Sequence, residues 1–183
     1  GLKAGATPSS ITSVAEAVAK GHDDSYLAGV ETIQVAVSGA HMEGLVLNKQ
    51  LTDRGARFVK CAKTAPIYRL LAFDGMKPPR PGLRGLVPAN GEQGASIELE
   101  VWEMPSAEFG AFVKLIAAPL GIGWLELEDG SKVQGFRLVD AGADASGVVS
   151  GNGKAGAAPT DITEHGGWRN YLGESAAKKA RTC

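Results

Sequence analysis

Most of the β-branched and aromatic residues of this chain lie in one stretch, residues 30–140, and the rest of the chain is poor in them. Such side chains favour strands and fill cores, so this stretch predicts one domain of about 110 residues, an ordinary domain size. Within it, short apolar runs are bounded by Gly, Pro or Asp, which is typical of strands joined by turns. A functional site is therefore to be sought in this stretch.

The segments outside the apolar stretch have a different composition. Residues 141–160 are dominated by Gly and Ala and contain no aromatic residue, and residues 1–29 are rich in Gly, Ala and Ser. Because such segments bury too little apolar surface to offset the entropy of ordering, we interpret 141–160 as a flexible loop and 1–29 as a linker or docking arm. Residues 161–172 are expected to pack on the core through Trp168, and 173–183 are expected to form a tail.

Strand patterns outnumber helix patterns in the core stretch. The predicted strands are residues 31–38, 57–63, 67–73, 96–104, 124–127 and 132–139. The last two are joined by Asp129-Gly130, whose preference for positive φ suits a tight hairpin turn. Helices are predicted at 49–54, behind Asn48 as a cap, and at 106–117. Without a regular βαβ alternation, the predicted class is α+β, a small mixed β-barrel with flanking helices.

Charge and composition exclude several classes of function. Nineteen Lys+Arg against twenty Asp+Glu give a net charge of -1 without a basic block, which argues against nucleic acid as a partner. No apolar run approaches a membrane span, so no membrane partner is expected, and two Cys without a signal peptide favour a cytoplasmic location. The His and Cys residues lack metal-ligand spacing, and no phosphate-binding loop lies between a strand and a helix, so no metal or cofactor is predicted.

The turn after the first predicted strand is the strongest local candidate for chemistry. Ser38, Gly39 and Ala40 follow the apolar run directly, and a Gly at a strand end lets backbone N–H groups converge on an anion. His41, the next residue, can take or give a proton near neutral pH. A plain turn with a solvated His is the alternative, and the residues alone leave both open.

Further candidates lie on two other predicted strands and behind the turn. Glu100 shares a strand face with Glu98 and Trp102, and a carboxylate beside Trp is often partly desolvated, which suits acid or base chemistry. A solvated outer face is the alternative. Tyr68 has the parity of an interior position, and together with Asn48 it completes the candidate substrate-binding residues.

Five collinear blocks resemble the C-terminal domain of allophanate hydrolase. They are VSGAHMEGLVLNKQLTDRGARFV (37–59), TAPIYRLLAF (64–73), IELEVWEMP (97–105), APLGIGWLELEDGSKVQGF (118–136) and DITEHGGWRNYL (161–172). The resemblance implies a γ-glutamylcyclotransferase-like fold, a small mixed β-barrel with helices. The family's amidase machinery has no counterpart in these 183 residues, so the resemblance implies an amidase domain as a partner, in cis or in trans.

The same resemblance implies a reaction in urea degradation. It implies decarboxylation of the N-carboxycarbamate that the amidase releases, with His41 at the position of the family's motif His. In the wider superfamily, a Tyr-Gly-Ser-Leu-type turn binds substrate and a strand Glu is the acid/base; residues 38–41 and Glu100 match these positions. Ser38 replaces the superfamily Tyr, which argues against a γ-glutamyl substrate. The insertion at 141–160 suggests a fungal version and a stand-alone protein.

Three functions are consistent with these observations. The first is a lyase that decarboxylates a small carboxylated substrate with His41 and Glu100 in one pocket. The second is a cyclotransferase or cyclase that acts on another small amide metabolite through Glu100 alone. The third is a non-catalytic domain that docks an amidase or forms a homodimer. A pocket with both side chains favours the first, Glu100 alone the second, and a filled barrel with a broad apolar face the third.

Overall fold

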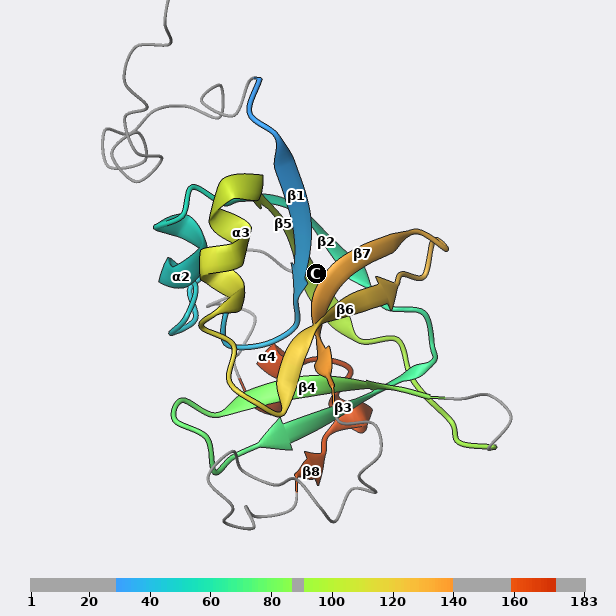
Figure 1. Cartoon of the computed structure of the whole chain (residues 1–183). Helices are drawn as coiled ribbons and strands as arrows, with labels where there is room; N and C mark the ends of the chain where they lie inside the picture. Colours follow the sequence, from blue (N-terminus) through green and yellow to red (C-terminus); the bar gives the residue numbers. More distant parts are fainter. Residues whose placement is uncertain (1–28, 87–90, 140–158, 174–183) are drawn as a thin grey trace, which may run out of the picture.

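The computed structural model describes residues 29–86, 91–139 and 159–173 (Figure 1). One mixed sheet has the strand order β2-β5-β1-β7-β6, and a second, antiparallel sheet has the order β4-β3-β8. The elements are β1 (Thr32–Val37), α2 (Lys49–Thr52), β2 (Arg57–Lys63), β3 (Tyr68–Phe73), β4 (Arg80–Gly85), β5 (Glu98–Pro105), α3 (Ser106–Val113), β6 (Leu120–Glu126), β7 (Lys132–Leu138), β8 (Thr160–Asp161), η3 (Thr163–His165) and α4 (Trp168–Tyr171).

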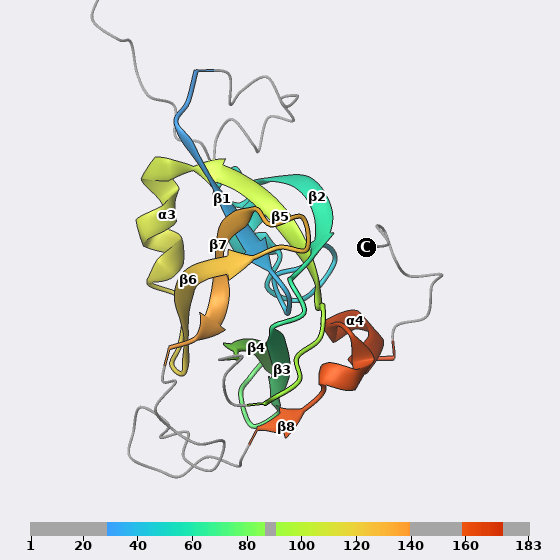
Figure 2. The ribbon, with the colours of Figure 1, turned by 90° about the vertical axis from the view of Figure 1, so that its right-hand side faces the viewer.

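The two sheets lie one below the other, and Figure 2 shows α3 on one side of the larger sheet and α4 beside the smaller one. β1 is the central strand of the larger sheet: it runs antiparallel to β5 and parallel to β7. The register pairs Val37, the last residue of β1, with Glu100 of β5. The turn that follows β1 therefore begins beside Glu100, in the middle of the fold.

The larger sheet curls but does not form a closed barrel. Its edge strands β2 and β6 approach each other at a single bridge between Thr64 and Leu127, where the Ala65 N–H donates to the Glu126 carbonyl at 2.9 Å. The predicted α+β class, a mixed sheet with flanking helices, is confirmed. The barrel is incomplete because the edge strands β2 and β6 are joined by one bridge and do not pair along their length. In addition, β3 and β4 pair with each other in a second sheet instead of extending the first.

β4 is the strand that local sequence does not predict. Its sequence, RPGLRG, contains Pro81 and two glycines, and none of these favours a strand. The strand forms because it pairs along its whole length with β3. Gly82 also lets it approach the β6–β7 pair closely, since a Cβ there would lie 2.7 Å from side-chain atoms of Leu120 and Leu138.

The core runs between the larger sheet and α3 and continues under the C-terminal segment. Phe112 of α3 is fully buried, and Ile162 and Trp168 near the C-terminus belong to the same hydrophobic cluster. The expected loop at 141–160 and tail at 173–183 lie outside the described residues except at their ends, as does the expected arm at 1–29. Within the described ranges, no helix is long and apolar enough to cross a membrane, and no group of His, Cys, Asp and Glu has the arrangement of a metal site.

Candidate functional site

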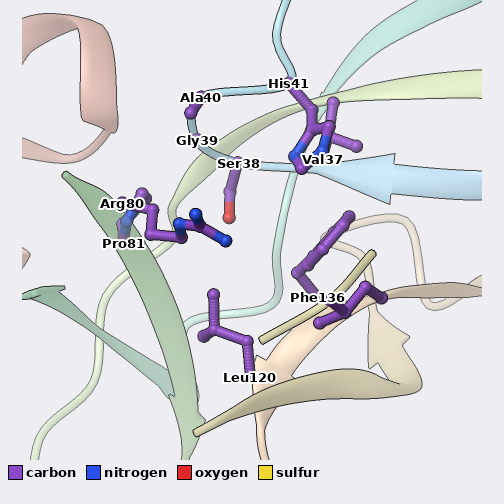
Figure 3. A pocket seen from close by; sticks show the side chains of 10 residues that line it. Val37, Ser38, Gly39, Ala40, His41, Arg80, Pro81, Leu120 and Phe136 are labelled. Atoms are coloured by element: carbon purple, nitrogen blue, oxygen red, sulfur yellow. The ribbon is translucent and has the colours of Figure 1, made fainter. Parts of the chain in front are cut away.

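A small pocket lies at the end of β1 (Figure 3). It is lined by the turn that follows β1, by β4 and by the β6–β7 pair. Residues 37–41 form one wall, and Arg80, Pro81, Leu120 and Phe136 lie opposite or beside it. The enclosed space is small, about 20 Å³, which is room for about one water molecule, so a ligand of several heavy atoms would also occupy the open mouth. The walls are mostly apolar, so a charged ligand here would depend on the few polar groups that reach it.

His41 is held in the pocket wall by ring contacts and one hydrogen bond. Its imidazole stacks on Phe136 at 4.9 Å between centroids, meets Phe112 edge-on at 5.4 Å, and places Nε2 at 2.9 Å from the Gln50 Oε1. The Gln50 Oε1 can only accept, so we assign the imidazole proton to Nε2. Burial lowers the pKa of His41 below its usual value, the hydrogen bond to Gln50 raises it, and the charge of Arg80 lowers it. We infer a neutral imidazole at pH 7, with Nδ1 as the nitrogen that can take up a proton.

Backbone hydrogen bonds and Asn48 shape the turn that carries His41. The Met42 N–H donates to the Gly39 carbonyl and the Leu47 N–H to the Ala40 carbonyl, both at 2.9 Å. Asn48 makes no side-chain cap to α2; its Nδ2 donates instead to the His41 carbonyl at 2.9 Å. Asn48 therefore supports the turn from behind and does not line the pocket.

The turn also presents backbone donors. Among the described residues, no hydrogen bond is donated by the N–H groups of Gly39, Ala40 or His41, all of which line the pocket. Free N–H groups in a row can bind an anionic oxygen. Ser38, which is buried, adds a hydroxyl to the same wall. Ser38, Gly39, Ala40 and His41 are thus together in one pocket; their role as binding and catalytic residues stays a prediction.

Gly39 is required at its position by close packing. A Cβ on Gly39 would lie 2.5 Å from the Pro81 Cδ and 2.7 Å from the Pro81 Cγ. The backbone there does not have a positive φ, unlike that of Gly44 in the same loop. The absence of a side chain therefore lets β4 approach the turn and close the pocket.

Arg80 is a site residue that sequence reasoning missed. Figure 3 shows its guanidinium directed into the pocket toward the hydroxyl of Ser38. Its Nε donates to the Pro78 carbonyl at 3.3 Å, and within the described residues its Nη groups donate no hydrogen bond. The one local signal is weak: Arg80 stands in the run Lys77-Pro78-Pro79-Arg80-Pro81, which predicts no strand.

Glu100 is paired with Val37, the residue before the turn, but it does not line this pocket. Its side chain is fully buried, and its Oε2 accepts from the Glu43 N–H at 2.8 Å and from the Trp102 Nε1–H at 3.0 Å. Its Oε1 accepts from the Arg169 Nη2 at 3.0 Å. Glu100 and Trp102 share a face, as alternation predicts, but the pocket that His41 lines does not include Glu100. A catalytic role for Glu100 stays a prediction.

Tyr68 is also placed away from this pocket. It is buried, and its hydroxyl accepts from the Glu126 N–H at 2.9 Å, which ties β3 to the end of β6. Burial agrees with the interior position expected from strand parity. A contact between Tyr68 and a ligand stays a prediction.

Comparison with known proteins places the chain in a family. The family model described as the allophanate hydrolase C-terminal domain matches residues 33–173. This chain belongs to that family. The match includes the whole pocket wall formed by the turn and by β4, and also Glu100 and Arg169.

Relatives of this allophanate hydrolase C-terminal domain include much longer proteins. The urea amidolyase of Saccharomyces cerevisiae is 40% identical over 142 residues, which is 77% of this chain and 7% of that protein. The urea amidolyase of Lachancea kluyveri is 36% identical over 143 residues, 78% of this chain and 7% of that protein. The chain therefore spans about 7% of the length of the curated relatives that it matches.

Two solved structures that are similar to this chain belong to proteins of different length. Kluyveromyces lactis allophanate hydrolase matches with a TM-score of 0.65 and 34% identity, over 78% of this chain and 21% of that one. A uropathogenic E. coli-specific protein matches with a TM-score of 0.64 and 31% identity, over 79% of this chain and 98% of that one. Structures similar to this chain thus occur inside a larger chain and as nearly the whole of a solved chain.

Proposed function

We propose that this domain binds a small dicarboxylate in the His41 pocket and decarboxylates N-carboxycarbamate to carbamate and CO₂. The observation that carries the proposal is the pairing of a buried His41 with the Arg80 guanidinium in one small apolar pocket. A planar guanidinium suits a carboxylate, and the free N–H groups of the turn suit another anionic oxygen. Membership of a family named for allophanate hydrolase supports a substrate of this kind.

The proposed step balances as ⁻OOC–NH–COO⁻ + H⁺ → H₂N–COO⁻ + CO₂. Arg80 holds one carboxylate, and the two negative charges of the substrate raise the pKa of His41, so that Nδ1 takes up a proton. The bond between nitrogen and one carboxyl carbon breaks, the electron pair stays on nitrogen, and His41 delivers its proton there. Apolar walls favour the step because a charged carboxylate becomes neutral CO₂.

An amidase domain is the proposed source of the substrate. The urea amidolyases that match this chain are much longer than the domain. We infer that an amidase, in the same chain or in a separate one, releases N-carboxycarbamate for this pocket.

The test follows N-carboxycarbamate directly. A separate amidase domain generates it in situ from ¹³C-labelled allophanate, and ¹³C NMR records its lifetime with and without this protein. We expect the wild type to shorten the lifetime and His41→Asn to slow the step about 10²- to 10⁴-fold, the usual contribution of a general acid or base. Glu103→Gln is the control, because Glu103 lies on the same strand as Glu100 but binds Thr32 and Arg57 instead of the turn.

Two outcomes would overturn this proposal. An unchanged lifetime with the wild type would favour the non-catalytic docking or homodimerisation function. Activity that survives His41→Asn but is lost in Glu100→Gln would show that Glu100, and not His41, is the acid/base.

A further inference from the structure

A buried ion pair connects the C-terminal segment to the turn that carries His41. Glu100 of β5 and Arg169 of α4 have side chains 0% and 5% exposed, and their Oε1 and Nη2 atoms are 3.0 Å apart. Taking two such groups out of water is costly, and apolar residues of similar volume often stabilise a fold as well or better. A buried pair of this kind is therefore weak evidence of a role in stability, and its contacts with the backbone indicate another role.

Both members of the pair bind the backbone of one residue, Glu43. The Glu43 N–H donates to the Glu100 Oε2 at 2.8 Å, and the Glu43 carbonyl accepts from the Arg169 Nη2 at 2.6 Å. Trp102 donates to the same Oε2 and fixes the orientation of the carboxylate. Since Glu43 is two residues after His41, the pair holds one end of the segment in which His41 lies, and Asn48 holds the His41 carbonyl itself.

We propose that Glu100 and Arg169 are positioning residues, which hold Glu43 and thereby keep His41 in place against the pocket. The oxygens of Glu100 already accept three hydrogen bonds and do not line the pocket with His41. The carboxylate at the position of the superfamily's acid/base thus acts here through the turn and not on the substrate. The consequence for turnover rests on the proposed function, but the positioning of His41 does not.

The two side chains allow variants with different expected effects. In Glu100→Gln, one oxygen can still accept from Glu43 and Trp102, but the amide N–H then faces the Arg169 Nη2, donor against donor. Arg169→Met removes both contacts of Nη2. Arg169→Lys is the conservative variant, because one ammonium can serve the two acceptors that the single Nη2 atom serves now.

A double variant keeps the test valid if a single variant unfolds. Removing one partner leaves an uncompensated buried charge, whereas Glu100→Gln combined with Arg169→Met removes both charges at once. Glu103→Gln is the matched control, since it changes a carboxylate of the same strand that is paired with Arg57.

The experiment measures the state of His41 in the folded protein. NMR titration gives the pKa of the His41 imidazole, and calorimetry gives the Kd for malonate, a dicarboxylate of the size of N-carboxycarbamate. We expect Arg169→Met and the double variant to raise the His41 pKa toward its ordinary value, because a loosened ring is better hydrated. We expect the malonate Kd to rise roughly 2- to 30-fold, the range for residues that do not touch the ligand. In Arg169→Lys, the His41 pKa and the malonate Kd should be close to those of the wild type. Glu103→Gln should change neither value.

The results that would overturn the proposal are specific. An unchanged His41 pKa and malonate Kd in the double variant would show that the pair does not position the turn. Loss of turnover in Glu100→Gln with both values unchanged would show that Glu100 is catalytic. If the wild type neither binds malonate nor turns over N-carboxycarbamate, the proposed function fails, and the His41 titration still decides whether the pair positions His41.

Discussion

At the scale of single residues, the pocket combines one fixed charge with one titratable ring. Arg80 supplies the charge, and its effect on His41 is to disfavour the imidazolium when no ligand is bound. A bound carboxylate would neutralise that charge and reverse the effect. The charge of Arg80 and the pKa of His41 are therefore coupled through the ligand. A change at Arg80 should be seen in the pKa of His41.

Replacing Arg80 tests this coupling. We expect Arg80→Met to weaken malonate binding about 10- to 100-fold, the range for a lost hydrogen bond to a charged group. We expect the same change to raise the pKa of His41 in the free protein, because the charge that lowers it is gone. Calorimetry and NMR titration provide the two values, with Arg57→Met as the control. Unchanged malonate affinity would remove Arg80 from the site.

Replacing Gly39 tests the close approach of β4. Gly39→Ala places a methyl group against Pro81, and we expect a loss of about 1 to 3 kcal/mol of unfolding free energy, as for overpacking elsewhere. Gly110→Ala is the matched control: no atom lies within 4 Å of the added methyl, and removing a helix glycine should stabilise by about 0.5 to 1 kcal/mol. Urea unfolding measures both, and equal effects would contradict the packing argument.

At the scale of elements, the C-terminal segment completes the core of the domain. Ile162 and Trp168 are 1% and 2% exposed, and the Ile162 N–H donates to the Leu70 carbonyl of β3 at 2.9 Å. Arg169 of the same segment holds Glu43. The segment thus contributes apolar burial to the fold and polar contacts to the turn.

Truncating Trp168 tests the contribution of this segment. We expect Trp168→Ala to cost about 3 to 5 kcal/mol of unfolding free energy, as for large side chains removed from a core. Trp124→Ala is the control, because Trp124 is 59% exposed and a surface change of this kind costs within about 0.5 kcal/mol. A small loss in both variants would mean that the C-terminal segment is dispensable for folding.

At the scale of the whole molecule, the buried His41 couples folding to pH. Burial lowers the pKa of His41 below its ordinary value in the folded state, so the unfolded chain binds the proton first as the pH falls. Stability is therefore fully present above the unfolded pKa and decreases below it, down to the folded pKa. This direction is opposite to that of a histidine stabilised by a carboxylate partner.

The pH dependence can be measured by urea unfolding between about pH 7.5 and pH 5. We expect the unfolding free energy of the wild type to fall below the unfolded pKa of His41, with a slope of at most about 1.4 kcal/mol per pH unit for one proton. His41→Gln removes this titration, so its slope should be smaller by the contribution of His41. Identical slopes in the two proteins would show that the imidazole is protonated equally in both states.

Local patterns determined the elements whose signals lie within a few neighbouring residues. Alternation and turn residues predict β2 with its bounds, the β6–β7 hairpin around Gly130, and the face shared by Glu100 and Trp102. The turn after β1, residues 38–41, is a candidate site for the same reason. These features depend on periodicity and backbone preference, which a single sequence contains.

Only the tertiary structure decided what faces the turn. β4 forms because β3 is available to pair with it and because Gly39 and Gly82 leave room, and it carries Arg80 into the pocket. Glu100 finds its partner Arg169, 69 residues away in sequence, and lies outside the pocket that His41 lines. Contacts between distant segments cannot be predicted from the periodicity of the sequence. They depend on how the sheets curl and on how closely one segment can approach another.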